Sequence, residues 1–122
     1  MGAKLMAVSM KQKRMTFERD GEQCVWCGTT SGLTVHHRKN RQAGGSKLRD
    51  HLANFLTACY TCNGQFEDNL MERARLLGVK LQQWEDPYRT AVHFKHFDQW
   101  RLLNDEGSFI VVDGRDYREV SE

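Results

Sequence analysis

The most regular hydrophobic spacing lies near the middle of the chain. Phe66, Leu70, Ala74 and Leu77 recur three or four residues apart, and Gly78 follows the last of them. Apolar residues at that spacing form one face of an α-helix, and a glycine just beyond commonly ends it. The pattern therefore predicts an amphipathic helix that stops at Gly78.

Shorter apolar segments on either side of this helix predict β-strands. Residues 33–37 partly alternate and contain β-formers, and residues 55–58 form a second short apolar run. Downstream, the stretches 91–97, 100–103 and 109–112 also have strand character. We expect residues 105–108 to form the loop of a hairpin between the last two.

The first twenty residues are basic and weakly patterned. Residues 14–20 are expected to form a helix that ends at Gly21, and residues 4–14 to begin as a flexible arm. The fold class expected from these helices and strands is α+β. At 122 residues, the chain is expected to form one domain, residues 1–122.

Composition narrows the functional classes. The chain has no apolar run of about 18 residues or more, and residues 1–15 lack the apolar stretch of a secretory signal. We therefore expect a cytoplasmic protein without membrane contacts. Residues 1–50 hold ten Lys and Arg against four Asp and Glu, whereas residues 51–122 hold eight against twelve. A basic half suits a polyanion such as nucleic acid, although solvated lysines explain the charge equally well.

All four cysteines lie in two Cys-x-x-Cys pairs, Cys24/Cys27 and Cys59/Cys62, separated by 31 residues. In a reducing compartment this arrangement favours metal ligands over disulfides. Four thiolates suit a closed tetrahedral structural zinc site, which leaves no open position for catalysis. The alternative is a set of redox-active or incidental thiols.

Between and beside these pairs lie His36-His37, Asn54 and Asn63. Histidine nitrogens and amide oxygens bind divalent cations, and a histidine with its ordinary pKa near 6.5 can accept a proton from water near neutral pH. Because consecutive strand residues point to opposite faces, one histidine can face a metal while the other faces an attacking water. The alternatives are two ordinary histidines on a surface strand, or one histidine that completes a zinc site.

The order Val35-His36-His37-Arg38, Gly44-Gly45, Asn54 and Cys59-x-x-Cys62-Asn63 resembles the HNH endonuclease family in its zinc-bearing form, and small phage-encoded members in particular. The resemblance covers residues 14–78. It implies a ββα-metal core with an N-terminal basic helix or arm. Residues 79–122 would then form a small β-rich extension.

The resemblance also assigns roles. It implies that His36 and Asn63 bind the catalytic divalent cation, that His37 is the general base, and that Asn54 orders the loop between the strands. This chain has Asn rather than His at the last position. Glu67, at i+4 from Asn63, is a candidate third ligand of the catalytic cation, which would be Mg²⁺, Mn²⁺ or another transition-metal ion. The alternative for Glu67 is a solvated helical carboxylate.

Basic residues that follow the histidine pair are candidate DNA-phosphate contacts: Arg38, Lys39, Arg41, Lys47 and Arg49. None lies on an evident base-reading helix, so weak sequence specificity is expected.

The sequence thus predicts a metal-dependent DNA endonuclease that nicks DNA or cuts both strands, as a monomer or a homodimer. A phage origin would place it in the host cytoplasm, with the DNA-packaging machinery as a candidate partner. The alternative is a non-catalytic zinc-ribbon module that binds DNA.

Overall fold

The computed structural model describes residues 8–40 and 50–116. Helix α1 spans Met10–Arg19 and is followed by Asp20 and Gly21. It begins four residues earlier than predicted because Ser9 caps it: the Ser9 hydroxyl accepts from the Gln12 amide, and the Gln12 side chain caps the Ser9 N–H in return. Part of the predicted flexible arm is therefore helical, and its residues 4–7 lie outside the described part of the chain.

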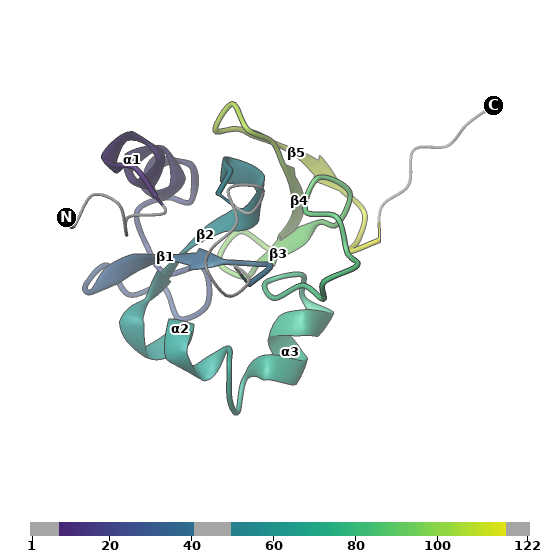
Figure 1. The fold of residues 1–122 in the computed structure, drawn as a ribbon, viewed down its shortest axis with the longest axis horizontal. Helices are drawn as coiled ribbons and strands as arrows, with labels where there is room; N and C mark the ends of the chain where they lie inside the picture. Colours follow the sequence, from purple (N-terminus) through teal and green to yellow (C-terminus); the bar gives the residue numbers. More distant parts are fainter. Residues whose placement is uncertain (1–7, 41–49, 117–122) are drawn as a thin grey trace.

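Strands β1 (Leu33–His37) and β2 (Phe55–Cys59) pair antiparallel, which confirms both predicted strands. A short 3-10 helix, η3 (Leu52–Asn54), leads into β2. Their register places His36 opposite Leu56 and His37 opposite Phe55. In Figure 1 this hairpin lies between α1 on one side and the two later helices on the other.

The helix predicted to run through Phe66 to Leu77 is interrupted, so that prediction was wrong in part. The structure has α2 (Tyr60–Gln65) and α3 (Met71–Leu76), joined by turns. Asp68 and Asn69 lie in this connection, and such residues favour turns because their side chains compete for backbone hydrogen bonds. Phe66 and Ala74 are nevertheless fully buried, so the apolar spacing correctly identified the inward-facing residues.

The C-terminal part forms a three-stranded antiparallel sheet in the order β3-β4-β5. This confirms the three predicted strands and the hairpin between the last two, although the first strand is shorter than the predicted range 91–97. The strands are β3 (Val92–Phe94), β4 (Gln99–Leu103) and β5 (Phe109–Val112). Residues 105–108 turn between β4 and β5, where the Asn104 side chain accepts from the Glu106 and Ser108 amides.

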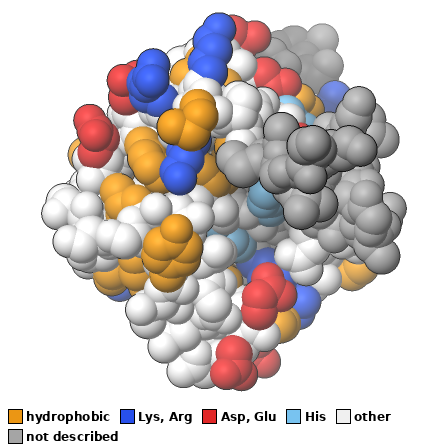
Figure 2. Space-filling model, turned by 60° about the vertical axis from the view of Figure 1, so that its left-hand side comes forward, with side chains coloured by type: hydrophobic (Ala, Val, Ile, Leu, Met, Phe, Trp, Pro, Cys, Tyr) orange, Lys and Arg blue, Asp and Glu red, His pale blue; other side chains and the backbone are white. Residues whose placement is uncertain are grey.

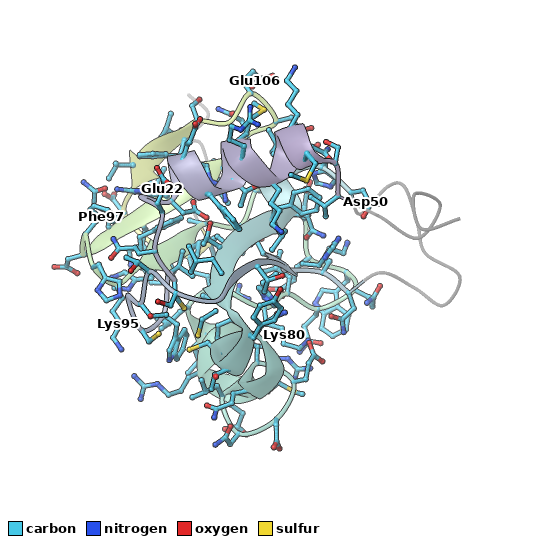
Figure 3. The ribbon with its side chains drawn as sticks, turned by 90° about the vertical axis from the view of Figure 1, so that its left-hand side faces the viewer. Glu22, Asp50, Lys80, Lys95, Phe97 and Glu106 are labelled. Carbon is cyan, nitrogen blue, oxygen red and sulfur yellow. The ribbon has the colours of Figure 1, made fainter. Side chains whose placement is uncertain are left out.

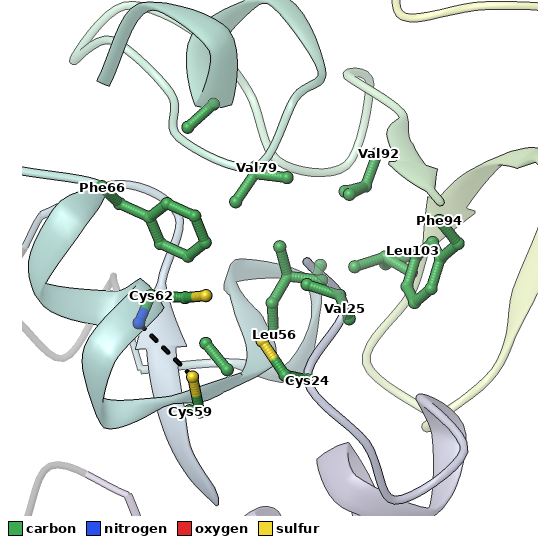
Figure 4. Packing of buried hydrophobic residues seen from close by; sticks show 13 residues of the cluster. Cys24, Val25, Leu56, Cys59, Cys62, Phe66, Val79, Val92, Phe94 and Leu103 are labelled. Atoms are coloured by element: carbon green, nitrogen blue, oxygen red, sulfur yellow. Dashed lines mark hydrogen bonds between the residues drawn. The ribbon is translucent and has the colours of Figure 1, made fainter. Parts of the chain in front are cut away.

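One hydrophobic cluster joins the two sheets. Leu56 of β2 and Phe66 after α2 pack with Val79, Val92 and Phe94 (Figure 4). The buried cysteines lie in the same cluster, so the core and the proposed zinc site share residues. The chain is thus a small α+β fold. Within the described ranges, no helix is long and apolar enough to cross a membrane.

Candidate functional site

The four cysteines converge as the spacing predicted. Their sulfur atoms all lie within 4.8 Å of one another, and none forms a disulfide. Cys27 Sγ lies 3.8 Å from Cys59 Sγ. Four sulfurs placed tetrahedrally about 2.3 Å from zinc would be about 3.8 Å apart. The donor set and its spacing therefore fit a single structural zinc ion.

Local backbone geometry prepares these thiols as ligands. The Cys27 amide points at Cys24 Sγ over 3.5 Å, and the Cys62 amide points at Cys59 Sγ over 3.4 Å. Amides aimed at sulfur stabilise the thiolate form. Burial raises the pKa of Cys62, so its thiolate needs a nearby cation to form at neutral pH. A bound zinc ion would supply that positive charge and release the protons.

His36 lies in the interior of the molecule with both ring nitrogens facing oxygens. It is 2% exposed, and its ring packs against Phe66 with centroids 4.8 Å apart. Nε2 lies 2.8 Å from the Val79 carbonyl oxygen, and Nδ1 lies 3.0 Å from Asn63 Oδ1. The structure thus brings together two residues, 27 positions apart, that the sequence assigned to one metal.

The protonation of His36 follows from these contacts. Burial lowers the pKa of His36 to about 4, so at neutral pH the ring carries a single N–H. The Val79 carbonyl can only accept, which assigns that N–H to Nε2. Nδ1 then presents its lone pair toward Asn63, and a cation between Nδ1 and Oδ1 would make this contact favourable. An Asn63 amide rotated by half a turn would instead donate from its nitrogen.

His37 has a different environment from its neighbour. Its side chain is 20% exposed and its Nε2 lies 3.1 Å from Asp50 Oδ1. The ring packs edge-on against Phe55, its cross-strand partner, at 5.0 Å. A carboxylate beside an imidazole orients the ring and stabilises its protonated form. Figure 2 shows histidine side chains near the centre of one face, with acidic and basic side chains close by.

Asn54 is fully buried and holds the chain just after β1. Its Oδ1 accepts from the Lys39 amide at 2.8 Å, its Nδ2 donates to the Lys39 carbonyl at 3.1 Å, and its own carbonyl accepts from the Arg38 amide. These bonds fix the exit of β1 against η3. They reach only the start of the loop between the strands, because residues 41–49 lie outside the described part of the chain, so the loop-ordering role implied for Asn54 stays a prediction.

Glu67, the candidate third ligand, lies in the turn after α2 rather than within that helix. Its Oε2 accepts from Lys80 Nζ at 2.7 Å, and its side chain is half exposed. In the described part of the chain, the four cysteines form the one group of three or more His, Cys, Asp or Glu able to share a metal ion. A cation at His36 and Asn63 would thus have two protein ligands, with water and substrate completing its shell.

The proposal that Arg38 contacts phosphate needs correction. Arg38 is fully buried, and its guanidinium donates to four backbone carbonyls, those of Gly78, Ala53, Pro87 and Thr90. Burial lowers the pKa of Arg38 to about 9, so it keeps its charge at neutral pH. It joins β1 to the later segments, and no phosphate can reach it. Lys39 is 9% exposed, and Arg41, Lys47 and Arg49 lie outside the described residues.

Sequence reasoning missed three contributors to this site: Asp50, the Val79 carbonyl and Lys80. Asp50 follows a long polar stretch without any spacing signal that connects it to His37. Val79 contributes its carbonyl oxygen, and the type of side chain does not indicate what a backbone atom binds. Lys80 directly follows the helix-ending Gly78-Val79 segment, and only the three-dimensional fold places it against Glu67.

Comparison of this chain with protein-family models, with curated proteins and with solved structures gives no match. Any function assigned to the site therefore depends on its geometry and chemistry.

Proposed function

We propose that this protein is a divalent-metal-dependent DNA endonuclease of the HNH type, with a ββα-metal core supported by a structural zinc ion. The arrangement that supports it is a β-hairpin followed directly by a helix. β1 carries His36 and His37, and α2 carries Asn63. The four cysteines join the segment before β1 to the start of α2, next to Asn63.

One observation carries the proposal: two lone-pair donors from distant segments meet at a partly buried position. His36 Nδ1 and Asn63 Oδ1 lie 3.0 Å apart. Two adjacent ligands about 2.1 Å from an octahedral ion would also be about 3.0 Å apart. The hydrogen bond from His36 Nε2 to the Val79 carbonyl fixes the tautomer that such a ligand requires.

His37 is the general base in this proposal. It takes a proton from the water that attacks the scissile phosphorus, and Asp50 stabilises the imidazolium that results. The cation held by His36 and Asn63 would supply positive charge to the phosphate and to the leaving 3′ oxygen. Asn54 keeps the end of β1, and so His37, in place.

Cleavage of supercoiled plasmid with Mg²⁺ or Mn²⁺ tests the proposal. We expect wild-type protein to cleave and a chelator to stop it. His37→Ala should lower the rate by about 10²–10⁴-fold, the usual contribution of a general base, while zinc content and DNA affinity stay unchanged. Lys95→Met, which removes an exposed charge, is the matched control and should cleave normally.

The outcomes separate this function from its rival. DNA binding without cleavage by any divalent cation would favour a non-catalytic zinc-ribbon module. Cleavage that persists in His37→Ala would remove His37 from the base role. A manganese-soaked crystal without anomalous density between His36 and Asn63 would exclude the proposed metal site.

A further inference from the structure

The proposed metal site has a basic neighbour that no motif identifies. Lys80 directly follows Val79, whose carbonyl holds His36, and its side chain is 3% exposed. Figure 3 places it beside the α2–α3 region. Its ammonium group is paired with Glu67, which follows Asn63 by four residues. Lys80 is thus connected to both candidate ligands, to His36 through the carbonyl of the preceding residue and to Asn63 through Glu67.

The partners of this ammonium group are few for a buried cation. An ammonium has three N–H donors, and burying a charge is costly unless it is paired and hydrogen-bonded. Lys80 Nζ makes one short bond, 2.7 Å to Glu67 Oε2, and has a second acceptor, Asn40 Oδ1, at the long distance of 3.5 Å.

The Glu67 carboxylate is the movable member of this pair. The Glu67 side chain is half exposed, whereas the Lys80 side chain is enclosed. A carboxylate and a phosphodiester oxygen present the same charge and similar acceptor atoms to an ammonium group. Glu67 can therefore swing into solvent, and an anionic substrate oxygen can take its position without leaving Lys80 unpaired.

We propose that Lys80 is the phosphate-binding group of this site, and that Glu67 occupies its ammonium group until the scissile phosphodiester displaces it. The inference rests on the proposed endonuclease function. Lys80 holds a non-bridging oxygen of the phosphate while His36 and Asn63 hold the cation on the same group. Displacement of Glu67 from Lys80 then costs free energy and weakens substrate binding accordingly.

Binding measurements test the exchange without requiring cleavage. In a His37→Ala background with Mn²⁺, Lys80→Met should weaken binding of a DNA duplex. It should also reduce the slope of log affinity against log salt by about one. Glu67→Gln should have the opposite effect and tighten binding several-fold. Lys95→Met controls for the loss of one charge elsewhere.

Kinetic measurements in the otherwise wild-type protein complete the test. Lys80→Met should lower kcat/KM by about 100-fold, comparable with the loss of one preorganised donor to a developing charge, and Lys80→Arg should restore part of it. Glu67→Gln should lower KM and leave kcat unchanged. Zinc content and Mn²⁺ affinity should match wild type in all three variants.

Each contrary result has a distinct meaning. If Lys80→Met lowers only the unfolding temperature and leaves both the salt slope and kcat/KM unchanged, the pair is structural and the inference is wrong. If Glu67→Gln weakens Mn²⁺ binding, Glu67 is a metal ligand and the exchange is wrong. If wild-type protein never cleaves, the endonuclease proposal fails, while the binding measurements still decide whether Lys80 contacts phosphate.

Discussion

Two adjacent histidines on one strand lie in different environments and differ in burial and in their hydrogen-bond partners. His36 faces the interior, where burial keeps it neutral and the Val79 carbonyl fixes its tautomer. His37 points to the other face and lies beside Asp50, with its side chain partly exposed. A neutral ring is suited to donate a lone pair to a cation, and a ring beside a carboxylate is suited to accept a proton.

The lowered pKa of His36 predicts a specific dependence of stability on pH. Above about pH 6.5 the ring is neutral in both folded and unfolded chains and contributes nothing. Between about 6.5 and 4 the unfolded chain binds a proton that the folded chain excludes, so the free energy of unfolding falls as pH falls. The pKa of about 4 implies a loss of up to about 3 kcal/mol.

Substitution of His36 by glutamine isolates this contribution, because glutamine can still donate to the Val79 carbonyl. We expect His36→Gln to lose less stability than wild type between pH 6.5 and 4, as measured by denaturant unfolding without added Mg²⁺ or Mn²⁺. Carboxylates, thiolates and other histidines titrate in both proteins and cancel. Equal pH slopes in the two proteins would show that His36 is not buried in its neutral form.

Residue chemistry was predictable where a motif fixes several positions together. His36 and Asn63 were expected to meet, and their side chains lie 3.0 Å apart. Arg38 was misassigned because sequence shows a charge but not whether four carbonyls converge on it. Lys80 was missed for a related reason: its chemistry depends on contacts with side chains more than ten residues away.

At the scale of elements, hydrophobic spacing predicted which residues face inward better than it predicted whether a helix is continuous. The hairpin strands and the C-terminal strands formed where alternation and β-formers indicated. The predicted long helix is interrupted between α2 and α3. Phe66 and Ala74 are both buried even though turns separate them. Apolar spacing alone contains no information about that break.

Two glycines in this region differ sharply in what they tolerate. Gly78 has φ +73°, and a Cβ there would lie 2.0 Å from the Ala91 carbonyl oxygen. Its own carbonyl also accepts from buried Arg38. We expect Gly78→Ala to lower the free energy of unfolding by about 3 kcal/mol or more, since strain and a clash of backbone atoms combine.

Gly64 is the matched control, because it lies inside α2 and a Cβ there would meet nothing within 4 Å. Gly64→Ala should raise the free energy of unfolding by about 0.5–1 kcal/mol through reduced backbone entropy. Chemical denaturation of both variants measures the difference. A Gly78→Ala protein as stable as wild type would mean that the α3–β3 connection is looser than its contacts indicate.

Across the whole molecule, the hairpin region and the C-terminal sheet depend on a few shared interior groups. Arg38 donates to carbonyls on both sides of the boundary, at Ala53 and at Thr90. The buried cysteines lie in the same cluster as Val92, Phe94 and Leu103. Removal of the zinc would therefore disturb the core that orients His36 and also the packing of the C-terminal sheet.

The contribution of zinc to the stability of the fold can be estimated. Structural zinc in small peptides contributes about 10–16 kcal/mol of apparent binding free energy, while whole domains are stable by about 5–15 kcal/mol. We therefore expect elemental analysis to find one zinc per chain. We also expect chelation to abolish cooperative folding, as measured by circular dichroism. Added zinc should restore the fold. Asn63→Ala, which lacks one proposed ligand of the proposed second cation, should unfold in the same way, because the unfolding depends on the four thiolates. A zinc-free protein that keeps its cooperative transition would show that the hydrophobic cluster alone holds His36 and Asn63 together.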